Sequence, residues 1–84
     1  MPRIDDFGWV RRVMKEAIGD EKGFRIRASG TSPEGPELEM GLYHRKGIKR
    51  LSLCGPGWSL NERPDKEQYV SDWTAQAVKE LKKE

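Results

Sequence analysis

One histidine and one cysteine are the residue types in this sequence that could form a nucleophile with its base. A cysteine thiolate activated by a nearby imidazole is a common catalytic pair. We expect His44 on the buried face of a hairpin and Cys54 on its outer face, more than about 15 Å apart at about 3.3 Å per strand residue. We therefore assign no catalytic residue and predict that the protein is not an enzyme.

Metal and cofactor sites need sets of residues that the sequence lacks. One histidine and one cysteine do not supply a structural zinc site, and the acidic residues do not have the spacing of a calcium loop. The glycine-rich segments 30–35 and 55–57 match neither nucleotide-binding fingerprint, because neither runs Gly-x-Gly-x-x-Gly or ends in Gly-Lys-Ser/Thr. We expect turns there, and neither a metal nor a cofactor.

A basic hairpin tip is the first candidate binding site. Its candidate residues are Tyr43, His44, Arg45, Lys46, Lys49 and Arg50, with no acidic residue among residues 43–50. Such a tip could contact phosphates, with the tyrosine stacking on a base or on Arg50. Charges at a hairpin tip also keep it soluble and prevent edge pairing. Nucleic-acid binding through residues 45–50 is therefore our alternative hypothesis.

Trp58 is the second candidate binding residue. It follows Gly-Pro-Gly, and a tryptophan on a rigid loop is a frequent anchor for a partner. A lid over a small core is the other interpretation. Trp9 is equally ambiguous, because two exposed tryptophans would form a larger apolar patch than a small monomer usually tolerates.

The segment from Glu37 to Cys54 must position these candidates, and its pattern predicts two antiparallel strands. A type I′ turn at Lys46 and Gly47 would place Leu42 opposite Leu51, so that the large apolar side chains share one face. Met40 would face Leu53. The opposite, polar face would then carry Glu39, Gly41, Tyr43, Arg50, Ser52 and Cys54.

A further strand begins at Phe24, where apolar and polar residues alternate. A loop over residues 30–36, rich in turn formers, joins it to the strand that begins at Glu37. Pairing apolar with apolar residues places Arg27 opposite Glu39, which predicts an ion pair. Together the strands predict a three-stranded antiparallel meander in sequence order. Trp58 and Leu60 would fold back to cover an edge of the sheet or the rim of the core.

Two amphipathic helices are predicted to flank the sheet. Apolar residues recur at helical spacing in both: Val10, Val13, Met14, Ala17 and Ile18 in the first, and Val70, Trp73, Ala77 and Leu81, flanked by Tyr69 and Val78, in the second. The first would be capped by Asp5 or Asp6 and end near Gly19. The second would be capped by Asp65 or Asn61 and ends in lysines that suit the negative end of its dipole. Only one sheet face has enough apolar residues to receive them. We predict an α+β two-layer sandwich of order αβββα, forming a single small domain over residues 1–84.

This order of elements is similar to that of double-stranded RNA-binding domains. There, a lysine-rich start of the second helix contacts phosphates across a groove. The corresponding segment here, Pro64 to Gln68, is balanced to acidic in charge. The similarity is therefore one of topology, and we assign no family.

Composition limits the remaining functions. The chain has 84 residues, 35% hydrophobic and 36% charged, and a net charge of +2, which is too small to imply a nucleic-acid partner by itself. It contains no apolar run that could cross a membrane, and a single cysteine is typical of a reducing, cytoplasmic environment. We interpret the protein as a non-catalytic protein-binding or self-associating module that uses the polar sheet face or a surface including Trp58.

Overall fold

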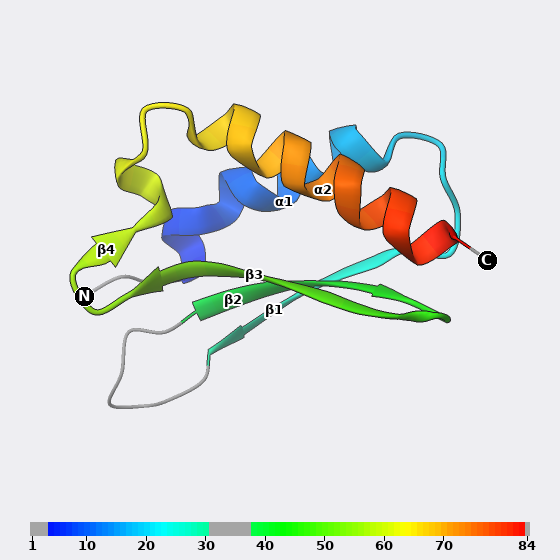
Figure 1. The fold of residues 1–84 in the computed structure, drawn as a ribbon. Helices are drawn as coiled ribbons and strands as arrows, with labels where there is room; N and C mark the ends of the chain where they lie inside the picture. Colours follow the sequence, from blue (N-terminus) through cyan, green and yellow to red (C-terminus); the bar gives the residue numbers. More distant parts are fainter. Residues whose placement is uncertain (1–3, 31–37, 84) are drawn as a thin grey trace.

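A computed structural model describes residues 4–30 and 38–83 (Figure 1). Its elements are η1 (Ile4–Phe7), α1 (Gly8–Ile18), β1 (Arg25–Gly30), β2 (Leu38–His44), β3 (Gly47–Gly55), β4 (Trp58–Ser59), η2 (Leu60–Glu62) and α2 (Lys66–Lys82). Two helices and an antiparallel sheet make an α+β arrangement, as predicted. Most of the predicted loop at 30–36, and the predicted strand start at Glu37, fall outside the described residues.

Both helices lie on the same side of the sheet in Figure 1. Their apolar stripes and the facing sides of β2 and β3 bury one cluster of side chains. It comprises Phe7, Val10, Val13, Met14, Met40, Leu42, Leu51, Leu53, Cys54, Leu60, Val70, Ala77, Val78 and Leu81. Of the six residues predicted on the polar face of the sheet, Cys54 alone belongs to this cluster.

The sheet has the strand order β1-β2-β3-β4, with each pair antiparallel. It contains the predicted meander and adds a short fourth strand. After β3 the chain turns at Pro56 and Gly57, where the glycine has a φ of 77° that residues with side chains rarely adopt. Trp58 then pairs with Gly55, and Leu60 is buried. The segment thus folds back on an edge, which was one of the two predicted alternatives, and it does so as a strand.

The turn between β2 and β3 begins one residue earlier than predicted. Arg45 and Lys46 form it, and His44 pairs with Gly47. No described residue other than glycine has a positive φ, so this is not the predicted type I′ turn, in which both central residues need one. Gly47 instead begins β3, beside Leu81 of α2, with a φ of 158°.

The pairing of β2 with β3 is consequently offset by two residues. Leu42 faces Lys49 rather than Leu51, and Met40 faces Leu51 rather than Leu53, so both predicted pairs are wrong. An offset of two does not by itself move a side chain to the other face, and Leu42, Leu51, Leu53 and Met40 are indeed buried. Alternation therefore determined the face but not the partner.

The same offset occurs between β1 and β2. Arg27 faces Gly41, and Glu39 faces Ser29, so the predicted Arg27 to Glu39 ion pair is wrong. The carboxylate of Glu39 lies instead 3.8 Å from the guanidinium of Arg50 on β3.

A β-bulge places Cys54 on the opposite face of the sheet from the one predicted. Glu39 pairs with Ser52, but Leu38 pairs with Cys54, so Leu53 is an extra residue on β3. One extra residue reverses the alternation beyond it. Cys54 is therefore 2% exposed in the core, whereas we predicted it on the outer polar face.

The helix starts also differ from prediction. Phe7, rather than Asp5 or Asp6, occupies the N-cap position of α1. Asp65 occupies that of α2, as predicted, but its side chain makes no capping bond, because its carboxylate accepts hydrogen bonds from Arg63 at 2.9 and 3.2 Å. Asn61 lies in η2.

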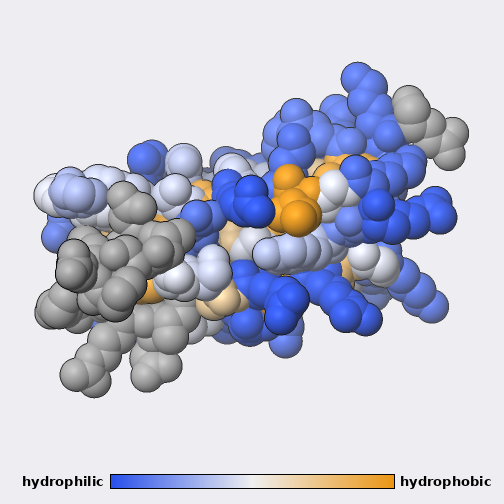
Figure 2. Space-filling model, turned by 90° about the horizontal axis from the view of Figure 1, so that it is seen from below, coloured by the Kyte–Doolittle hydropathy of each residue, from blue (hydrophilic) through white to orange (hydrophobic). Residues whose placement is uncertain are grey.

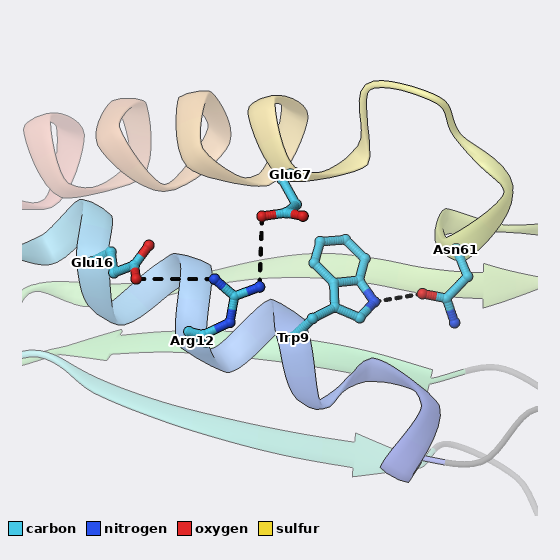
Figure 3. Close-up of polar contacts among 5 residues, drawn as sticks. All are labelled: Trp9, Arg12, Glu16, Asn61 and Glu67. Carbon is cyan, nitrogen blue, oxygen red and sulfur yellow. Dashed lines mark hydrogen bonds and ion pairs between the residues drawn. The ribbon is translucent and has the colours of Figure 1, made fainter.

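Side chains tie the two helices and η2 together (Figure 3). Trp9 Nε1 donates to Asn61 Oδ1, and Asn61 Nδ2 donates to the carbonyl of Asp6 at 3.0 Å. Arg12 of α1 lies 3.5 Å from Glu67 of α2. Trp9 is therefore a half-buried structural residue that packs on the core, not an exposed anchor.

Candidate functional site

The basic hairpin tip lies against the end of α2. Lys46 Nζ donates to the carbonyls of Lys82 and Lys83, at 3.4 and 3.3 Å. The last carbonyls of a helix lack intrahelical partners and carry partial negative charge, so an ammonium group is favourable there. This lysine serves as a cap for α2.

The neighbouring cations are also paired within the chain. Lys49 lies 3.4 Å from Glu80 of α2, and Arg50 lies 3.8 Å from Glu39. Arg45 is exposed and has no ion-pair partner among the described residues. Most of the lysines and arginines of the tip thus have a contact inside the protein, which favours a structural use for them.

His44 and Cys54 do not form a dyad. His44 stacks on Phe24 with ring centroids 4.6 Å apart, and its Nδ1 accepts the backbone N–H of Lys46 at 3.2 Å. Cys54 lies at the other end of β3, about 20 Å away along the strand. The two residues are therefore far apart, as predicted, but they lie on the same, inner side of the sheet and not on opposite faces.

The open face of the sheet, which is turned away from the helices, is mostly hydrophilic where Figure 2 colours it, with a hydrophobic area near its centre. Ile48 belongs to this face, because it pairs with Tyr43, and it is 45% exposed. The ring of Tyr43 lies against Gly41, where an added Cβ atom would come within 2.6 Å of it. Tyr43 is therefore half-buried over the sheet and not extended toward a partner.

A cleft of about 410 Å³ opens along β3, and we call it the edge cleft. It is lined by Arg50, Leu51, Ser52, Trp58, Ser59, Leu60, Arg63, Tyr69 and Trp73. Alternate residues of a strand point to opposite faces. Since Arg50 and Ser52 point to the open face and Leu51 to the core, a cleft that all three line lies at the edge of the strand itself.

Three aromatic side chains shape the edge cleft. Trp58 is 45% exposed, and its indole lies so close to Gly55 that an added Cβ atom would be 2.5 Å from Nε1. Tyr69 and Trp73 stand one turn apart on α2, on the same side of the helix. Leu60, rather than Trp58, closes the core at this end.

Arg63 completes the wall of the edge cleft. Its guanidinium lies 4.2 Å from the ring centroid of Tyr69 and donates two hydrogen bonds to Asp65. The hydrogen bond from Arg63 lowers the pKa of Asp65 below its ordinary value, and the same bond raises the pKa of Arg63. The arginine thus contacts both the ring of Tyr69 and the carboxylate of Asp65.

Of the predicted site residues, the structure brings only Arg50 and Trp58 together in the edge cleft. The others lie along the tip or on the open face. Sequence reasoning missed Arg63, Tyr69 and Trp73 as site residues. The spacing of Tyr69 and Trp73 was visible, but their proximity to Trp58 depends on how α2 crosses the sheet.

Among residues 4–30 and 38–83, no three histidine, cysteine, aspartate or glutamate side chains gather as metal ligands would. None of the described helices has the length and apolarity needed to cross a membrane. No family model, curated protein or solved structure matches the chain.

Proposed function

We propose that this protein is a non-catalytic protein-binding module whose partner is bound at the edge cleft. The observation that carries the proposal is the coincidence, in one place, of exposed aromatic and arginine side chains with a strand edge. Tryptophan, tyrosine and arginine are the residues that most often dominate binding energy at protein interfaces. In the edge cleft, Trp58 lies against Gly55, and Arg63 lies over the ring of Tyr69.

The basic tip supports nucleic-acid binding less well than the sequence suggested. Lys46 and Lys49 each have a partner within the chain, and a phosphate would have to compete with that partner. Binding through the tip would be strongly salt-dependent. An electrophoretic shift with duplex or single-stranded RNA at low salt, lost when Arg45 and Lys46 are both changed to Gln, would favour that alternative.

Site-specific photo-cross-linking tests the protein-binding proposal. A photoreactive phenylalanine analogue replaces Tyr69 in the edge cleft, or Gln76, which is exposed elsewhere on the same helix. We expect covalent protein adducts in cells from position 69 and few from position 76. Equal adducts from both positions, or none from either, would contradict the proposal.

Sedimentation equilibrium complements this experiment by reporting self-association. A chain that is dimeric at micromolar concentration, and that cross-links to itself through position 69, would show that the partner is a second copy. A monomer that gives heterologous adducts would show a separate protein.

A further inference from the structure

We infer that the partner binds as an added β-strand: an extended, acidic segment of another protein that pairs with residues 47–53 of β3 and continues the line of β4. This inference rests on the proposed function and names the chemistry of its partner. Strand addition at an exposed sheet edge is a general mode of peptide recognition, with affinity from the main chain and specificity from pockets for alternate side chains.

Among the described residues, the edge of β3 that faces away from β2 has no neighbouring strand over most of its length. β4 pairs only with Cys54 and Gly55, the last two residues of the strand. The chain then leaves the sheet, because Ser59 Oγ accepts the N–H of Asn61 at 3.2 Å and starts η2. Within the described part of the chain, residues 47–53 have backbone pairing on one side only, with β2.

The edge cleft lies where a longer β4 would run. It begins beside Trp58 and Ser59 and follows β3 back to Arg50. A segment placed there would direct alternate side chains toward the open face, near Arg50, and toward Tyr69 and Trp73 of α2. The site therefore offers a row of backbone groups together with an aromatic recess for inward side chains.

The opposite edge of the sheet is less suited to this role. β1 forms that edge, and the guanidinium of Arg11 on α1 already donates to the backbone carbonyl of Ile26 at 3.2 Å. Side chains that cover or charge an edge strand are a common protection against unwanted pairing. On β3, no described side chain hydrogen bonds to the backbone of residues 47–53.

The positive charges on β3 favour an acidic partner segment over a second copy of the same strand. Lys49 and Arg50 are adjacent on β3, and a second copy of this strand would bring the same cations against them, which opposes self-pairing. An acidic residue would instead reach Arg50, whose side chain is 65% exposed and only loosely paired with Glu39. The matching segment alternates acidic residues with apolar or aromatic ones.

A blocked peptide, acetyl-Glu-Val-Glu-Phe-Glu-Val-Glu-amide, is the probe, titrated into the full chain with tryptophan fluorescence as the readout. Two N-methylated peptides are compared with it. One carries methyl groups on the backbone amides of the Glu residues, and the other carries them on the backbone amides of the Val and Phe residues. In an antiparallel pair only alternate amides face the neighbouring strand. We expect saturable binding below about 1 mM, with one version losing at least about tenfold in affinity and the other retaining it.

Variants locate the binding. Tyr69→Ala is expected to weaken the peptide at least about tenfold, whereas Tyr43→Ala, the matched aromatic change outside the edge cleft, leaves its affinity unchanged. Arg50→Gln is expected to weaken it several-fold, and Arg27→Gln, on the same face but on β1, is the charge-matched control. Urea unfolding of each variant verifies that it remains folded.

The inference is overturned if both N-methylated peptides bind equally well, if the same peptide with Lys in place of Glu binds as tightly, or if a mixed-sequence single-stranded RNA displaces the peptide. The last result would assign the edge cleft to nucleic acid. If position 69 cross-links to a protein but the acidic peptide does not bind, strand addition is contradicted and the proposed protein-binding function is not. If there are neither adducts at position 69 nor peptide binding, both strand addition and the proposed function are contradicted.

Discussion

Thr74 is a buried polar side chain in the core, and its hydroxyl has no hydrogen-bond partner among the described residues. An unsatisfied buried hydroxyl costs about 1 to 3 kcal/mol. Thr74→Val, which keeps the branched shape, is therefore expected to raise the free energy of unfolding by about 1 kcal/mol in urea denaturation. Thr74→Ala is the control that also removes a methyl group. A valine variant less stable than the parent would show that the hydroxyl is satisfied.

The Arg63 to Asp65 pair predicts a pH effect at a single carboxyl group. Its hydrogen bond with Arg63 lowers the pKa of Asp65, so the stabilisation is present above the ordinary aspartate pKa of about 3.9 and is lost as the pH falls through the lowered value. Arg63→Gln is expected to return the pKa of Asp65 to its ordinary range in an NMR titration of the carboxyl carbon. Arg12→Gln should leave it unchanged. An unaltered titration in Arg63→Gln would contradict the assignment.

Among the elements, the β2 to β3 hairpin depends on α2 as much as on its own turn. Lys46→Met removes the donors to the carbonyls of Lys82 and Lys83, and is expected to lower the free energy of unfolding by about 0.5 to 1 kcal/mol. Arg45→Met, at the adjacent turn position, should change it by less. Chemical denaturation measures both. Equal effects would show that the turn, and not the helix end, needs the charge.

The elements that sequence reasoning recovered are those with strong periodicity. Val10, Val13 and Met14 predicted α1 through their helical spacing, and alternation predicted which face of each central strand is buried. Pair partners were wrong by two residues in both hairpins, since such an offset preserves the faces. The bulge at Leu53, which turns Cys54 inward, had no periodic signal.

The candidate site was predictable only in part for a related reason. Trp58 and Arg50 were recognisable as candidate binding residues, but the sequence did not decide whether Trp58 is an exposed anchor or a lid over the core. Tyr69 and Trp73 resembled the flank and the stripe of a core helix, which they partly are. Their contribution to the edge cleft depends on the packing of α2 across the end of β3, a long-range contact that local pattern does not encode.

At the scale of the whole molecule, the two sheet edges differ in how they are protected. Arg11 occupies a backbone acceptor on β1, while β4 covers only the last two residues of β3. The helices cover one face, and the other is mostly hydrophilic. The edge cleft is thus the place where an incomplete sheet and exposed aromatic side chains meet.

Amide hydrogen exchange over residues 47–53, with and without the acidic peptide, tests this account most directly. In the free protein we predict slow exchange for the alternate amides that pair with β2 and fast exchange for those that face the open edge. Saturating peptide should slow the fast set at least about tenfold. Slow exchange at every one of these amides in the free protein would contradict an unpaired edge on β3. Protection by the peptide that appears only around Arg45 and Lys46 would contradict binding at that edge.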